Sequence, residues 1–198
     1  MKGNDEQSKE AKMLVTFRII DTETRLHSAP AILSARELAT LTRLLAENAL
    51  APDLDEGQRE GSAYHFEFNA NRLPLARIAS ALDWRGDVIS VVEEAQFLGR
   101  SLRIERVPPM LEIALRVSDH IALTEDLILD KIDALTVAGI LGVDFRKRSI
   151  KLADLAAKLA RPSVEQSFYN SRLSHIHYAL SRAANIDCGE QSPVLEWA

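Results

Sequence analysis

The sequence predicts an α+β protein with a small, mostly antiparallel sheet and covering helices, followed by an all-helical C-terminal part. In residues 111–117, leucine, isoleucine or valine occupies every second position and alternates with Glu112, Ala114 and Arg116, which is typical of a half-buried strand. From residue 124 to residue 186 apolar residues return every three or four positions, which is typical of helices. The order of strand and helix patterns before residue 120 favours a mixed fold over an all-helical one.

The N-terminal half begins with a strand over residues 13–20, because alternate apolar residues there occupy one face. A second strand could follow over 25–30, although Pro30 confines it to an edge. Ser34 and Glu37 have the spacing of a capping box and predict a helix over 34–50. An aromatic strand then carries Tyr64, Phe66 and Phe68.

Helices are predicted next over 74–82 and 88–98, the latter ending at Gly99, where glycine can adopt the left-handed cap. The segments on either side of Pro108 and Pro109 can pair as an antiparallel hairpin. These elements predict the following division of the chain: a disordered tail over 1–12, an α+β domain over 13–120, a helical domain over 121–186 and a tail over 187–198.

The predicted helical domain contains a helix from Thr124 to about Leu141 and a short helix over 151–160. Arg161 and Pro162 interrupt the pattern, and a long helix follows over 163–186. Two helices joined by a short turn predict a helix-turn-helix-like hairpin, whose second helix can enter the major groove of DNA.

Charge singles out the same region of the chain. The segment Val143–Ile186 holds eight basic and three acidic residues, a formal charge of +5, whereas the whole chain carries −5. The polar side chains of the second helix could contact the edges of bases. The basic residues that precede this helix in the sequence could contact phosphates. The predicted macromolecule-binding residues are Arg146, Lys147, Arg148, Lys151, Arg161, Gln166, Asn170 and Arg172.

No residue pattern indicates a catalytic, cofactor or metal site. Phosphate-binding glycine loops and the GxSxG nucleophile motif are absent from the sequence. His175 and His177 are two residues apart on a predicted helix, so they point away from each other and cannot share a metal ion. The aromatic residues of strand 64–68 could stack on bases, but the acidic residues near them favour a place in the core.

Three functions remain open from sequence. The first is a non-enzymatic intracellular regulatory or adaptor protein that binds another macromolecule, a protein above all, through its C-terminal helices or its acidic surface. The second is a DNA-binding transcriptional regulator that uses the basic hairpin 146–184, and the third is an enzyme of unrecognised type.

The sequence also bears on compartment and assembly. The polar residues 1–12, the absence of an apolar run of about 20 residues and the single Cys188 favour the cytoplasm and no membrane partner. Homo-oligomerisation stays open.

Overall fold

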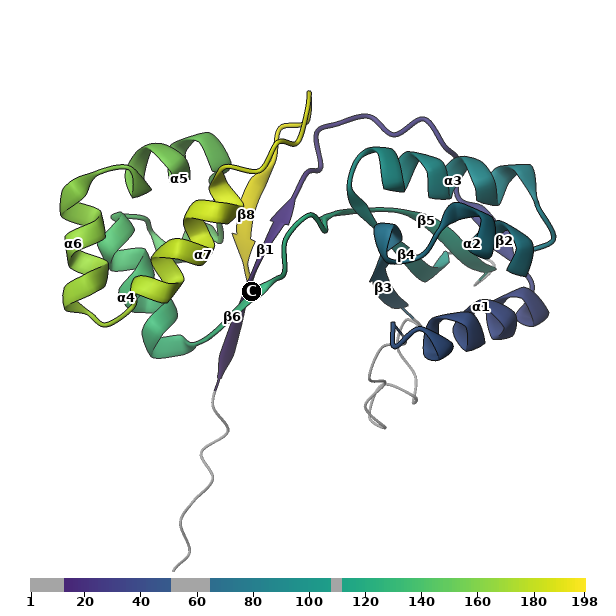
Figure 1. Cartoon of the computed structure of the whole chain (residues 1–198), viewed down its shortest axis with the longest axis horizontal. Helices are drawn as coiled ribbons and strands as arrows, with labels where there is room; N and C mark the ends of the chain where they lie inside the picture. The colour runs from purple at the N-terminus through teal and green to yellow at the C-terminus, as the bar shows by residue number, and fades with distance from the viewer. Residues whose placement is uncertain (1–12, 51–64, 108–111) are drawn as a thin grey trace, which may run out of the picture. The chain divides into compact units, whose positions relative to one another are not determined.

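The computed structural model describes residues 13–50, 65–107 and 112–198 and mixes helices with antiparallel strands (Figure 1). The predicted tail 1–12 and Tyr64 lie outside these residues. The chain forms two units, each assembled from separate stretches of sequence. Unit 1 is Met1–Arg18, Asp126–Asn185 and Leu195–Ala198, and unit 2 is Ile19–Glu125 and Ile186–Val194.

This division differs from the predicted ranges 13–120 and 121–186. The reason is strand pairing, because the first and last strands of the chain both join the helical part. Local sequence patterns identify strands but do not show which distant strands will pair.

Unit 2 contains a short antiparallel sheet and three α-helices. The strands pair in the order β3, β4, β5, with β2 also paired to β5. The elements are β2 (Ala31–Leu33), α1 (Ala35–Glu47), β3 (His65–Asn69), the 3-10 turn η2 (Ala70–Arg72), α2 (Leu75–Ala81), α3 (Gly86–Phe97), β4 (Arg100–Val107) and β5 (Glu112–Ile121). The predicted hairpin on either side of the prolines is confirmed, since β4 pairs with β5.

The core of unit 2 lies between these helices and strands. Phe66 and Phe68 are buried in it, which confirms the core interpretation for these two aromatic side chains. The predicted end of helix 88–98 at Gly99 is also confirmed, because Gly99 follows α3 and has a φ of 65°. The short strand expected over 25–30 is wrong: β2 begins at Ala31, after Pro30, where the backbone amides can again bond to a neighbouring strand.

The capping box at the start of α1 is confirmed. The Ser34 hydroxyl accepts a hydrogen bond from the Glu37 amide at 3.3 Å, and the Glu37 carboxylate accepts one from the Ser34 amide at 2.8 Å. Arg85, which precedes α3, donates to the same carboxylate at 2.7 Å. The Ser34 hydroxyl also donates to this carboxylate at 2.6 Å, and the hydrogen bonds that the carboxylate accepts from Ser34 and Arg85 lower the pKa of Glu37 from 4.5 to about 2.

This lowered pKa predicts an acid-sensitive contribution to stability. Because the folded-state pKa of Glu37 is depressed, its contribution is fully present above pH 4.5 and is lost as the pH falls toward about 2. The substitution Glu37→Gln keeps the cap but loses the charge. We expect it to lower the free energy of unfolding by about 1–2 kcal/mol at pH 7 and by much less near pH 2, as measured by urea unfolding. An equal loss at both pH values would contradict this role.

Unit 1 contains four α-helices and most of the strands β1, β6, β7 and β8 of the antiparallel sheet. Its strands pair in the order β6, β1, β8, β7. The elements are β1 (Leu14–Ile20), β6 (Leu127–Asp130), α4 (Lys131–Leu141), the 3-10 turn η3 (Phe145–Lys147), β7 (Ser149–Lys151), α5 (Leu152–Leu159), α6 (Pro162–Asn170), α7 (Ser174–Ala184) and β8 (Val194–Trp197). In Figure 1 the four α-helices lie to one side of β1 and β8.

Three predicted elements of this unit are wrong. The helix expected from Thr124 begins at Lys131, because residues 127–130 pair with β1 and Asp130 provides the N-cap. The expected helix 163–186 is two helices, since Arg172 takes a left-handed φ of 60° between them. The tail 187–198 includes strand β8.

The C-terminal part is mainly helical, which agrees in part with the all-helical part that the sequence predicted, because strands β6, β7 and β8 also belong to it. Within the residues that the structure describes, no helix is long and apolar enough to cross a lipid bilayer.

Candidate functional site

The eight predicted binding residues all lie on the surface of unit 1. They belong to the stretch from η3 to the turn between α6 and α7. No ion pair with a carboxylate neutralises the six cations among them within the described part of the chain. The described part of unit 1 holds ten Lys and Arg residues against seven Asp and Glu residues, so it is basic, whereas the described part of unit 2 holds ten against 15 and is acidic.

Four of these cations belong to one short segment, residues 146–151, which we call the basic turn. Asp144 caps its start, because its carboxylate accepts a hydrogen bond from the Arg146 amide at 3.0 Å. Arg148 takes a φ of 58°, and its carbonyl oxygen accepts a hydrogen bond from the Trp197 amide at 2.9 Å. The turn is therefore held by β8 while its basic side chains stay in solvent.

The exposed side chains of α6, α7 and the turn between them are almost free of carboxylates. We call this surface the polar helix face. From residue 161 to residue 182 the exposed residues are Arg161, Pro162, Ser163, Glu165, Gln166, Tyr169, Asn170, Ser171, Arg172, Ser174, His175, Tyr178 and Arg182. Only Glu165 among them is acidic, although about one residue in seven of the whole chain is. The remaining polar groups are mainly amides, hydroxyls, an imidazole and guanidinium groups.

Helix α7 contributes residues that sequence reasoning missed. His175, Tyr178 and Arg182 follow one another at spacings of three and four, so they share one stripe of the helix. The Arg182 guanidinium lies 6.0 Å from the centre of the Tyr178 ring. The same spacing would place them on one stripe of a single helix from residue 163 as well, so the spacing is the sequence signal that could have found them.

The opposite side of α7 packs against the other helices. Ile176 and Leu180 are fully buried, and α7 contacts both α5 and α6. His177 lies half-buried, with its ring centre 5.2 Å from that of Phe168, while His175 is exposed. No group of three His, Cys, Asp or Glu residues in the described ranges is arranged to hold a metal ion.

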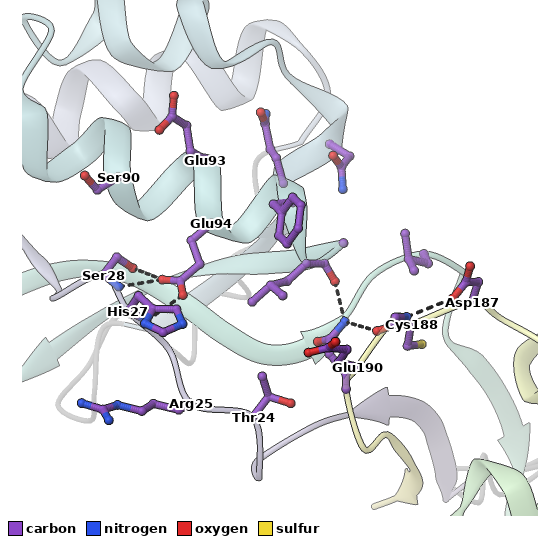
Figure 2. A pocket seen from close by; sticks show the side chains of 18 residues that line it. Thr24, Arg25, His27, Ser28, Ser90, Glu93, Glu94, Asp187, Cys188 and Glu190 are labelled. Atoms are coloured by element: carbon purple, nitrogen blue, oxygen red, sulfur yellow. Dashed lines mark hydrogen bonds between the residues drawn. The ribbon is translucent and has the colours of Figure 1, made fainter.

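A second candidate site is a groove in unit 2 with a volume of about 1250 Å³ (Figure 2). Its walls come from residues 24–28, helix α3, the residues that follow α3, Leu123 and residues 187–191. Four of the side chains that line it are carboxylates and one is an arginine, Arg25. We call it the acidic groove. Sequence reasoning could not find it, because its walls lie far apart in the chain.

Two sets of hydrogen bonds hold the walls of the acidic groove. Glu94 accepts hydrogen bonds from the amides of His27 and Ser28 at 2.6 and 2.7 Å, which ties this segment to α3 (Figure 2). Burial raises the pKa of Glu94, but the bonds from Ser28 and His27 outweigh it, so the pKa is lowered and the group stays ionised. Across the groove, the Gln191 amide nitrogen donates to the carbonyl oxygens of Leu98 and Cys188, both at 3.0 Å.

The chemistry of the acidic groove does not favour a cysteine nucleophile. Burial, followed by the charge of Asp187, raises the pKa of the Cys188 thiol, so the thiol is protonated at neutral pH. The arrangement offers charge and shape for binding a partner.

Comparisons of this chain with protein-family models, with curated proteins and with solved structures found no significant match.

Proposed function

We propose that this protein binds duplex DNA through unit 1. The observation that carries the proposal is the polar helix face, where one carboxylate lies among three arginines and many amide and hydroxyl groups. The basic turn continues the same stretch of chain. In an acidic protein, a surface with three arginines and one carboxylate is complementary to a polyanionic partner.

The residue types of the polar helix face suit the two kinds of contact that DNA offers. Arginine pairs with guanine edges and phosphates, whereas asparagine and glutamine pair with adenine. Gln166 donates a hydrogen bond to Asn170 at 3.0 Å, which fixes both amides before DNA arrives. The cations of the basic turn suit phosphates, since they sit on a short anchored segment.

The order of helices α5, α6 and α7 also supports a helix-turn-helix-like mode of DNA binding. It differs from the arrangement predicted from the sequence in which helix would contact the bases. Helix α7 packs on α5, and the short helix α6 connects them, so α7 rather than one long helix would be the reading helix. Its stripe of His175, Tyr178 and Arg182 begins near the N-terminus of α7, where reading helices contact bases. No side chain caps this N-terminus, which leaves backbone amides available to a phosphate.

The salt dependence of binding tests this proposal. The full chain should bind a fluorescein-labelled duplex of about 30 base pairs, and the logarithm of affinity should fall with the logarithm of salt concentration at a slope of about −5, if six cations meet phosphates. Replacing Arg146, Lys147 and Arg148 with glutamine should make the slope less steep, from about −5 to about −2. The same change should weaken binding about 10- to 100-fold near 100 mM salt. Fluorescence anisotropy measures both quantities.

A matched variant removes the same charge from unit 2. Arg36, Arg43 and Arg72 are exposed there, and their replacement by glutamine should leave the affinity and the slope nearly unchanged. Equal weakening by both triple variants would mean that net charge alone governs binding. No measurable binding of the unaltered chain at about 50 mM salt would refute the proposal.

A further inference from the structure

We propose that the acidic groove of unit 2 docks a cationic amphipathic segment of a protein partner, one in which lysine or arginine residues flank an aliphatic or aromatic side chain. This site is separate from the DNA-binding surface and does not depend on it. Three features carry the proposal: apolar side chains exposed in the groove, unpaired carboxylates beside them, and walls that are already fixed.

The apolar part of the groove is unusually open to solvent. Phe97, the last residue of α3, is 88% exposed, and Leu123 is 45% exposed. Phe97 is the most exposed large apolar side chain of the described residues. An aromatic ring in this position contributes nothing to the core of unit 2, and aromatic side chains are the commonest anchors of protein interfaces.

Gly99 fits this apolar surface in two ways. Its φ of 65° ends α3, and a side-chain β-carbon at this position would lie 2.6 Å from the Leu123 Cδ2 atom. A β-carbon here would displace the Leu123 side chain from the end of α3, so glycine at this position lets Leu123 line the groove.

The carboxylates give the groove its charge. Glu93, Asp187 and Glu190 line it, and none forms an ion pair with a basic side chain within the described ranges. The Glu94 carboxylate already accepts hydrogen bonds from the amides of residues 27 and 28, so its role is structural. The only cation of the lining is Arg25. A surplus of negative charge around an apolar centre complements a segment with the opposite charge.

The walls need little rearrangement on binding. Residues 27–28 are fastened to α3 by Glu94, and residues 187–191 are fastened by Gln191, whose side-chain oxygen accepts a hydrogen bond from the buried Arg100 at 2.8 Å. Ordering a loop at the moment of binding costs affinity, and a fixed groove avoids that cost.

The charge of the groove argues against other occupants. Nucleic acid would meet carboxylates, which repel phosphates. A second copy of this chain could dock about a two-fold axis, with its groove against the first groove. The same patch meets itself in such an interface, so the carboxylates of the two grooves would face each other. A cationic segment of a different protein avoids both conflicts.

The experiment measures peptide binding by the full chain. The probe is a fluorescein-labelled peptide of about 12 residues in which lysine and arginine flank leucine and phenylalanine, and a second peptide has glutamate in place of every basic residue. We expect micromolar binding of the basic peptide at about 50 mM salt and at least tenfold weaker binding of the acidic peptide. Equal binding of both peptides would overturn the proposal.

Variants locate the binding site. Phe97→Ala should weaken binding at least tenfold, and Glu93→Gln combined with Glu190→Gln should weaken it about three- to tenfold and reduce its salt dependence. All three side chains are exposed, so the fold should be retained. Trp84→Ala is the matched control, because Trp84 is 60% exposed and does not line the groove. Loss of peptide binding in the control, or none in Phe97→Ala, would contradict the assignment.

Two further measurements separate this site from the alternatives. The triple glutamine variant of the basic turn should bind the peptide as the unaltered chain does, so the DNA and peptide results can fail independently. Sedimentation velocity over a range of protein concentrations tests for a second copy. Self-association that Phe97→Ala abolishes would show that the groove holds another copy of this chain, and the proposed partner would then be wrong.

Discussion

Replacing Arg100 with methionine is expected to lower the free energy of unfolding by about 3–5 kcal/mol at neutral pH. The Arg100 side chain is 1% exposed and that of its partner Asp21 is 0% exposed, and the two are joined at 2.7 Å. Arg100 also donates to the Asp21 carbonyl oxygen at 2.9 Å and to Gln191 at 2.8 Å. Without Arg100, the Asp21 carboxylate stays buried with no opposite charge. Urea unfolding followed by circular dichroism measures the loss.

The double variant Arg100→Met, Asp21→Asn shows whether the stability loss comes from the unpaired charge of Asp21 or from the packing lost with the Arg100 side chain. Removing one partner of a buried pair costs far more than removing the charges of both, because the uncompensated charge causes the larger loss. The double variant should therefore be more stable than Arg100→Met alone. A double variant that loses the sum of the two single losses would show that the pair interaction is not the cause.

The stability loss caused by Arg100→Met should shrink as the pH falls toward the folded-state pKa of Asp21. Burial raises the pKa of Asp21, but hydrogen bonds from Thr24 and Glu23 and the charge of Arg100 outweigh it, so the pKa lies below 3.8. In the unaltered protein this contribution to stability is present above pH 3.8 and is lost as the pH falls through the folded pKa. Arg100→Met removes one cause of this lowering while the hydrogen bonds from Thr24 and Glu23 remain, so the Asp21 pKa should rise toward its ordinary value. Protonation of Asp21 removes the stranded charge in the variant, so the stability difference from the unaltered protein, measured by urea unfolding, should be smaller near about pH 3 than at about pH 7.

Features that depend on neighbours in sequence could be predicted. The capping box of Ser34 and Glu37, the cap at Gly99 and the alternating strand 112–117 all follow from local spacing. Strand β6 could not, because its leucines also fit a helix and only pairing with β1 decides between the two. The break at Arg172 has no glycine or proline to announce it, although the backbone there is left-handed.

The candidate sites follow the same rule. The cations of the basic turn and the amides of α6 could be found, because each lies on a short exposed segment whose composition is distinctive. The stripe on α7 was missed, although its spacing of three and four residues can be read from the sequence. The acidic groove and the Arg100–Asp21 pair could not be predicted at all, because both join residues from distant parts of the chain.

Replacing Trp197 with alanine is expected to lower the free energy of unfolding by about 3–5 kcal/mol. Trp197 is 3% exposed, and its ring centre lies 5.8 Å from that of Phe17 and 5.9 Å from that of Phe145. Its indole nitrogen donates to the Phe145 carbonyl oxygen at 2.9 Å. The truncation thus opens a cavity between the two phenyl rings and strands a carbonyl group. Thermal unfolding measures the effect.

Two substitutions serve as controls for this loss. Trp197→Phe keeps an aromatic ring but loses the indole donor, and it should cost about 1–2 kcal/mol. Trp84→Ala removes the other tryptophan of the chain, whose side chain is 60% exposed, and it should change stability by less than about 1 kcal/mol. Equal stability of Trp197→Ala and the unaltered protein would mean that β8 does not belong to the core of unit 1.

The same residue links the core of unit 1 to its proposed function. The Trp197 indole nitrogen donates to the Phe145 carbonyl oxygen and its backbone amide donates to that of Arg148, so Arg146 and Lys147 of the basic turn lie between two hydrogen bonds to β8. At a temperature where Trp197→Ala remains folded, the backbone bond to Arg148 persists but the anchor at Phe145 is lost. The cations of the turn must then be ordered on binding, which should weaken DNA binding about three- to tenfold without changing the salt slope. A changed slope would mean that the cations themselves had left the interface.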